Sequence, residues 1–224
     1  MKRLWHWPID PLARTVRLLL GEKKWSYEAI EIRPWVSDLE LAALAPGARA
    51  PAFLDTDAEV RTTALGSLAI CGYIEETAPT PRLFPFPAGE RAEARRLWQW
   101  SEEGFAGINN TLLEERVRQW VKRDRSPDSQ AMRQGLHALK NRMTFLDALA
   151  SERSYLAGRQ LSIADLSVAA HLSAYDYFGD VPWELAPDLK AWYSRIKSRP
   201  GFRPLLADRV GSAKPSKHYA DLDF

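Results

Sequence analysis

Ser162-Ile163-Ala164-Asp165 is the stretch of this sequence that says most about its fold. The Ser162 side chain can accept a hydrogen bond from the backbone N–H of Asp165, and the Asp165 carboxylate can reach back to the N–H of Ser162, which predicts a capping box at a helix start. The residues from 166 to 172 are apolar on almost every side, so we expect the helix to lie in the core. Ser162 and Asp165 are therefore interpreted as structural residues without a part in catalysis.

The chain around this helix divides into regions of different pattern. Residues 91–210 carry apolar side chains at three- and four-residue steps, which predicts an all-helical domain. Residues 1–78 alternate as strand, helix, strand, then two strands and a helix, the α/β order of a thioredoxin-like domain. A proline-rich linker, residues 79–90, joins the two, and residues 211–224 form a polar tail. The fold class is thus α/β plus all-α.

The second half of the predicted α/β domain contains a hairpin and a helix. Residues 52–55 and 59–61 are expected to pair as strands around a turn at Asp57 and Ala58. Residues 67–76 then form a helix. Its buried face is predicted to comprise Leu68, Ile70, Tyr73 and Ile74.

Composition excludes several classes of protein. With 46% hydrophobic residues, the 224-residue chain can bury a substantial core. Its 31 basic and 29 acidic residues give a net charge of +2 without a basic stripe, which argues against a nucleic-acid binder. The lone Cys71 allows no internal disulfide, and the four histidines lack metal-ligand spacing, so we assign no metal. No signal peptide or membrane-spanning run is evident, so we expect a cytoplasmic protein without membrane insertion.

Three motifs resemble those of the glutathione S-transferase family. The first is Tyr155-Leu156-Ala157-Gly158 followed by the capped helix at Ser162. The second runs from Leu189-Lys190-Ala191-Trp192-Tyr193 to Ser198-Arg199-Pro200-Gly201-Phe202, and the third is the Ala50-Pro51 turn. Together they cover nearly the whole chain. The resemblance implies a thioredoxin-like domain packed on a helical one, usually in a homodimer, with a cis Ala50-Pro51 bond, which only X–Pro tolerates cheaply.

The reactive position of that family is altered here. The resemblance places a hydroxyl or thiol, which favours the glutathione thiolate, where this chain has Asp10 and Ala13. Ala13 offers no hydrogen bond, and an ionised Asp10 about 4 Å from the thiolate would oppose it by roughly 4 kcal/mol at an effective dielectric of about 20. This repulsion raises the thiol pKa, the opposite of what the chemistry needs. The alternative interpretations of Asp10 are a helix N-cap and a solvated loop carboxylate.

The glutathione-anchoring motif is altered as well. Where the family has Glu-Ser, this chain has Gly66-Ser67, so the acid that would meet a ligand ammonium is missing. Ser67 is either an anchor for an anionic ligand at a helix N-terminus or a plain N-cap. Ala50, Pro51 and Ser67 are the predicted remnant of the site. Glutathione is therefore not required as a cofactor, although its binding is not excluded.

The resemblance also reaches one branch of the family, which acts in bacterial cell division and binds filaments of FtsZ. The residues that carry it are the Asp10-Pro11 loop, Pro34-Trp35, Gly66-Ser67 and the acidic-aromatic end of the chain. The implied function is a non-catalytic homodimer that binds FtsZ or another division protein and is recruited to the division site. The expected contact elements are Trp35, the helix from Arg91 to Trp98, and the tail residues Asp221, Leu222, Asp223 and Phe224.

Several alternatives remain open at this point. Trp35 either anchors a partner beside a cleft or simply packs. The tail either frays or docks on its own domain or on a partner. The other function is a glutathione transferase for small electrophiles, in which Arg14 or a bound water replaces the missing hydroxyl, unless Arg14 is a loop or interface charge. A glutathione-dependent reductase would need a cysteine near position 10, and the sequence has none there.

Overall fold

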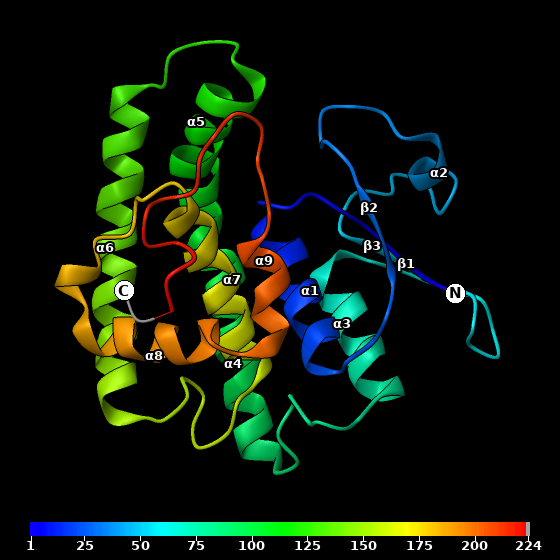
Figure 1. Ribbon diagram of the computed structural model, residues 1–224. Helices are drawn as coiled ribbons and strands as arrows, with labels where there is room; N and C mark the ends of the chain where they lie inside the picture. Colours follow the sequence, from blue (N-terminus) through cyan, green and yellow to red (C-terminus); the bar gives the residue numbers. More distant parts are fainter. Residues whose placement is uncertain (223–224) are drawn as a thin grey trace.

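A four-stranded sheet forms one side of the computed structural model, which describes residues 1–222 (Figure 1). The strand order is β2-β1-β3-β4, with β1 parallel to β2 and antiparallel to β3, and β3 antiparallel to β4. The strands are β1 (Lys2–His6), β2 (Glu28–Glu31), β3 (Ala52–Asp55) and β4 (Thr62–Leu65). Helices α1 (Pro11–Glu22), α2 (Leu39–Ala42) and α3 (Gly66–Thr77) complete this thioredoxin-like part.

Most residues from 88 to 206 are helical, as predicted. A single long helical rod runs from residue 88 to residue 122 and contains two π-helical stretches. Its segments are α4 (Ala88–Ile108), the π-helix η1 (Asn109–Leu113), α5 (Glu114–Val117) and the π-helix η2 (Arg118–Lys122). The remaining helices are α6 (Ser129–Glu152), α7 (Ile163–Tyr177), η3 (Trp183–Leu185), α8 (Pro187–Lys197), η4 (Pro200–Phe202) and α9 (Arg203–Leu206).

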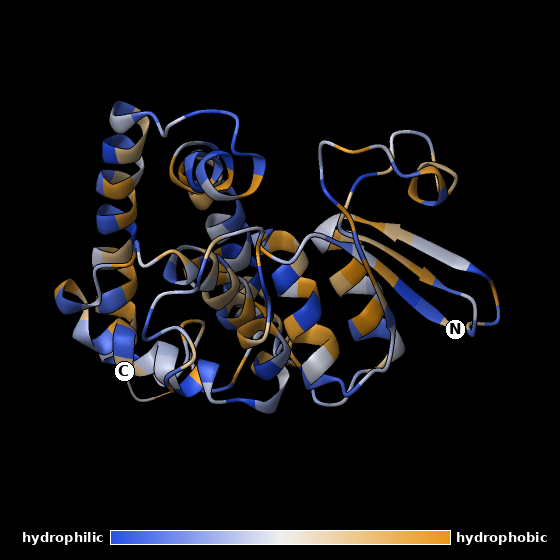
Figure 2. Cartoon of the chain, turned by 45° about the horizontal axis from the view of Figure 1, so that its top comes forward, coloured by the Kyte–Doolittle hydropathy of each residue, from blue (hydrophilic) through white to orange (hydrophobic). Residues whose placement is uncertain are grey.

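Helix α7 lies at the centre and joins the two parts. All its residues are buried, and it packs on both α1 and α4. The capping box at Ser162 is confirmed. The buried Asp165 carboxylate accepts hydrogen bonds from the backbone N–H groups of Leu156 (2.8 Å) and Ser162 (2.9 Å) and from the indole of Trp192 (3.1 Å). Figure 2 shows the hydrophobic residues concentrated on the central helices, which matches a core shared by both parts.

Two details of the α/β part differ from the sequence-based expectation. The second hairpin strand is Thr62–Leu65 instead of 59–61, because an Asx-type bond from the Asp57 N–H to Asp55 Oδ1 (2.9 Å) starts a longer loop. The predicted burial of Leu68 is wrong, since its side chain is 70% exposed. The predicted burial of Ile70 and Ile74 is confirmed, and Tyr73 is partly buried. The helix begins at Gly66 and also buries Ser67, Cys71 and Glu75.

The described part of the tail, up to Tyr219, docks on the helical part of the molecule. Tyr219 is fully buried, and the Ser216 N–H donates to the Tyr177 carbonyl at 2.8 Å. The cis Ala50-Pro51 bond is confirmed, and a second cis bond joins Thr80 to Pro81. Of the predicted tail contacts, Asp223 and Phe224 lie outside the described residues.

Candidate functional site

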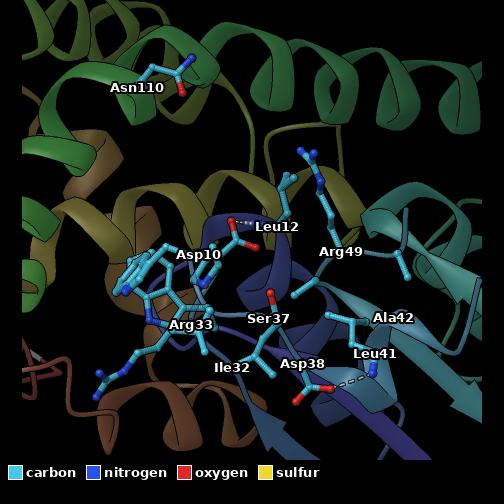
Figure 3. Close-up of a pocket in the computed structure, with 16 residues that line it drawn as sticks. Asp10, Leu12, Ile32, Arg33, Ser37, Asp38, Leu41, Ala42, Arg49 and Asn110 are labelled. Atoms are coloured by element: carbon cyan, nitrogen blue, oxygen red, sulfur yellow. Dashed lines mark hydrogen bonds between the residues drawn. The ribbon is translucent and has the colours of Figure 1, made fainter. Parts of the chain in front are cut away.

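A cleft of about 950 Å³ opens between the loops of the α/β part and the long helical rod (Figure 3). The loop after β2 supplies most of its wall, the start of α1 and the turn before Pro51 supply two further sides, and Asn110 of η1 supplies the fourth. The structure therefore brings together three residues singled out in the sequence. These are Asp10, Trp35 and Ala50.

Asp10 is the N-cap of α1, which confirms one of the two structural interpretations. Its Oδ2 accepts from the Ala13 N–H at 3.0 Å, and its Oδ1 accepts from the Leu12 N–H at 3.4 Å. Burial raises the pKa of this carboxyl to about 6, and the nearby Glu102 adds to the rise, although the capping bonds oppose it. The fully buried Ala13 offers the cleft no polar group. A carboxyl group thus stands where a thiolate-stabilising donor would be needed.

Ser67 is engaged by a residue that the sequence did not reveal. The N-cap of α3 is Leu65, so the N-cap interpretation of Ser67 is wrong. The Ser67 hydroxyl instead donates to Glu102 Oε1 of α4 at 2.6 Å, and the Trp98 indole donates to the same oxygen at 2.8 Å. Burial raises the pKa of Glu102. Ser67 and Pro51 do not line the cleft.

Arg14 is a fully buried residue of α1, so it is neither a loop charge nor a residue that can reach a ligand. Its Nε donates to the Pro8 carbonyl at 2.7 Å. Its Nη1 donates to Ser173 Oγ at 2.8 Å and to the Tyr219 hydroxyl at 2.9 Å, while Nη2 donates to Asp208 at 3.4 Å. A side chain held on every side in this way links α1, α7 and the tail and has no access to a ligand.

Trp35 is held at the cleft by both parts of the molecule. Its ring meets the edge of Trp7 with centroids 5.3 Å apart and planes at 85°. The Lys122 ammonium of η2 lies 4.7 Å from the ring centroid, a cation–π contact, and also bonds Glu114 at 2.8 Å. Even so, Trp35 stays 41% exposed. It therefore packs on one side and presents a surface to solvent on the other.

The other predicted contact elements lie apart from the cleft. Asp221 and Leu222 follow the docked Tyr219, and neither lines the cleft. Trp98 is buried and bound to Glu102, so the predicted contact helix can present only the outward residues around it, such as Arg91 and Arg95. Cys71 is buried, and burial raises the pKa of its thiol far above the usual range, as expected for an inert cysteine.

Residues 1–222 contain neither a cluster of metal-binding side chains nor a helix that could span a membrane. No set of three or more His, Cys, Asp or Glu side chains within this range is placed to hold a metal ion. Nor does any helix in the same range combine the length and apolar character needed to cross a membrane.

Known proteins resemble this chain along its whole length. Family models of the glutathione S-transferase N-terminal and C-terminal domains match residues 4–82 and 115–200. The sequence is 42% identical over 224 residues to FtsZ-localized protein A of Caulobacter vibrioides, covering 100% of this chain and 98% of that protein. The structure of FzlA from C. crescentus superposes with a TM-score of 0.94 at 42% identity, over 100% of this chain and 99% of that one. A glutathione S-transferase structure from Rhodospirillum rubrum gives 0.91 at 39% identity, covering 100% of both chains.

Proposed function

The chain belongs to the glutathione S-transferase family, and we propose that it is a binding protein of bacterial cell division that engages FtsZ filaments without catalysing a reaction. The observation that carries this proposal is the 42% identity to FtsZ-localized protein A, which extends over the entire chain. The cleft supports it, because the start of α1 holds the N-cap Asp10 and the buried Ala13 instead of a group that would stabilise a thiolate. On this proposal glutathione is not a required cofactor.

We propose Trp35 as the main residue that contacts the FtsZ filament. An aromatic ring that is fixed by Trp7 and Lys122, yet half exposed, loses little conformational entropy when it binds a partner. The tail, from Asp221 to Phe224, is the second proposed contact element.

We further propose that the protein acts as a homodimer through the outer face of α3 and the start of α4. Leu68 and Phe86 are exposed there, beside a hollow of about 440 Å³ lined in part by Arg91 and Arg95. A two-fold dimer would present two copies of the cleft, so that one dimer could bridge or bend a filament.

The test of filament binding is co-sedimentation of the purified protein with FtsZ polymers. We expect the wild type to sediment with the polymers and Trp35→Ala to lose most of this binding. Phe145→Ala is the matched control, because Phe145 is an equally exposed aromatic residue that lies on α6 and away from the cleft. Equal sedimentation of all three proteins would remove Trp35 from the interface, and absence of wild-type binding would refute the proposed function.

The alternative function is glutathione transfer to small electrophiles, with Ala50 and Ser67 holding the peptide. It is favoured by one observation, the position of Ala50 in the wall of the cleft. Isothermal titration with glutathione up to millimolar concentration separates the two functions. Affinity in the micromolar range would support the enzyme and lead to transferase assays on the wild type and Asp10→Ser. No detectable heat would remove that function.

A further inference from the structure

The acidic side chains of the cleft have hydrogen-bond partners within the protein, and its arginines have no acidic partner among residues 1–222. Of its two acids, Asp10 caps α1, and Asp38 caps α2 through a 2.7 Å bond from the Leu41 N–H to Oδ1. Its two arginines, Arg33 and Arg49, have no hydrogen bond or ion pair to an acidic side chain within the described part of the chain. Both are exposed. The cleft therefore offers two guanidinium groups that lack an acidic partner among the described residues, while its two carboxyl groups already accept hydrogen bonds as helix caps.

These arginines share the cleft with an apolar surface. Figure 3 shows the Arg49 side chain extending toward the long helical rod and the Arg33 side chain extending away from that rod. The wall of the same cleft also contains Trp7 and Trp35. A ligand that contacts both arginines and both tryptophans needs carboxylates at two separated positions and an apolar group.

The apolar surface continues beyond the cleft along the loop after β2. Val36 is 56% exposed and Leu39 is 86% exposed, although both are aliphatic. Leu39 does not line the cleft, so a ligand that stays inside the cleft would leave it in water. Isolated exposed apolar residues are ordinary, but a run that extends from a cleft rim is typical of a surface that a protein covers.

We propose that this cleft recognises an acidic segment of the partner protein, whose carboxylates pair with Arg33 and Arg49 and whose apolar side chain packs on Trp35. The proposal rests on the proposed function, because it specifies the chemistry by which the filament protein is recognised. Arginine suits this purpose, since its planar guanidinium pairs with a carboxylate through two parallel hydrogen bonds. The acidic partner would also be drawn to the site by long-range attraction, which salt weakens.

The experiment compares charge-reversal variants in FtsZ co-sedimentation over a range of salt concentrations. The test variant is Arg33→Glu/Arg49→Glu. The matched control is Arg61→Glu/Arg133→Glu, which makes the same change in net charge at two exposed arginines outside the cleft. We expect the test variant to bind at least about tenfold more weakly than the wild type and to lose most of its salt dependence, and the control to bind within about twofold of the wild type.

Each outcome decides between the two proposals. If Trp35→Ala abolishes binding but the Arg33/Arg49 variant binds like the control, the cleft still engages the filament and the acidic-segment proposal is overturned. If the wild type does not sediment with the polymers, the proposed function fails and this inference fails with it. If instead glutathione binds, and charge reversal abolishes that binding while sparing sedimentation, the occupant is a small anion and the proposal is also overturned.

Discussion

Replacing Tyr219 by Phe tests whether the buried arginine network holds the tail on the core. The Tyr219 hydroxyl accepts a hydrogen bond from Arg14 at 2.9 Å and donates to the Leu205 carbonyl at 3.1 Å. A hydrogen bond to a charged group contributes about 1.5–3 kcal/mol, and an unsatisfied buried carbonyl costs roughly 1 kcal/mol more. Because the ring itself is kept, the change creates almost no cavity. Tyr219→Phe should therefore lower the free energy of unfolding by about 2–4 kcal/mol.

The assay is urea unfolding at pH 7.5, followed by tryptophan fluorescence, with limited proteolysis to report release of the tail. Tyr155→Phe serves as the matched control, because the Tyr155 ring packs at the edge of the core and its hydroxyl makes no hydrogen bond to another residue between 1 and 222. The control should shift the urea midpoint little, and the tail of Tyr219→Phe should be cut sooner than that of the wild type. A destabilisation below about 0.5 kcal/mol for Tyr219→Phe would refute the assignment of this network as the tether.

Three further predictions concern buried polar groups. The pKa of Asp10 is raised from 3.8 to about 6, so ionisation of its carboxyl group destabilises the folded state as the pH rises through this range. At pH 7.5 the free energy of unfolding of Asp10→Asn should exceed that of the wild type by up to about 3 kcal/mol, and near pH 4 the difference should vanish. Urea unfolding midpoints at the two pH values measure it. Burial lowers the pKa values of His6 and His171 from 6.5 to about 4. The free energy of unfolding should therefore fall below pH 6.5 by up to about 3 kcal/mol for each histidine, which together exceeds the stability regained as Asp10 is protonated. A thermal midpoint that stays constant between pH 7 and 5 would contradict this. Asp165→Ala leaves three buried N–H donors unpaired and should cost roughly 4 kcal/mol or more in thermal unfolding, against about 1 kcal/mol for Ser162→Ala.

Local signals account for the parts of the fold that the sequence predicted. The capping box at Ser162 and the buried helix after it depend on residues within one turn of each other, and both are confirmed. Asp10 as an N-cap is equally local, since its acceptors and donors are three residues apart at most. The cis bond before Pro51 came from family resemblance, because no local pattern distinguishes it from a trans bond.

The residues that sequence reasoning misplaced depend on distant partners. Arg14 meets Ser173 and Tyr219, which lie 159 and 205 residues away, and nothing near Arg14 in the sequence indicates that it will be buried. Ser67 meets Glu102 across 35 residues. An arginine in a first helix and a serine near a helix start are both common at protein surfaces, so their local sequence does not predict burial. The partners of Arg14 become evident only when α1 packs on α7 and the tail, and the partner of Ser67 only when α3 meets α4.

The Glu102 carboxylate changes what the start of α3 can do. A helix N-terminus with a serine hydroxyl attracts an anion, and here the protein supplies that anion itself, held by Ser67 at 2.6 Å and by Trp98 at 2.8 Å. A ligand carboxylate would have to displace Glu102 and would meet Asp10 nearby, two carboxyl groups whose pKa values are already raised by burial. Glu102 does not line the cleft, whose walls are the loop after β2, the start of α1 with Asp10, the turn before Pro51, and Asn110 of η1. On the proposed function, the same fold would disfavour a ligand carboxylate at the start of α3 and leave Trp35, Arg33 and Arg49 available to a partner protein.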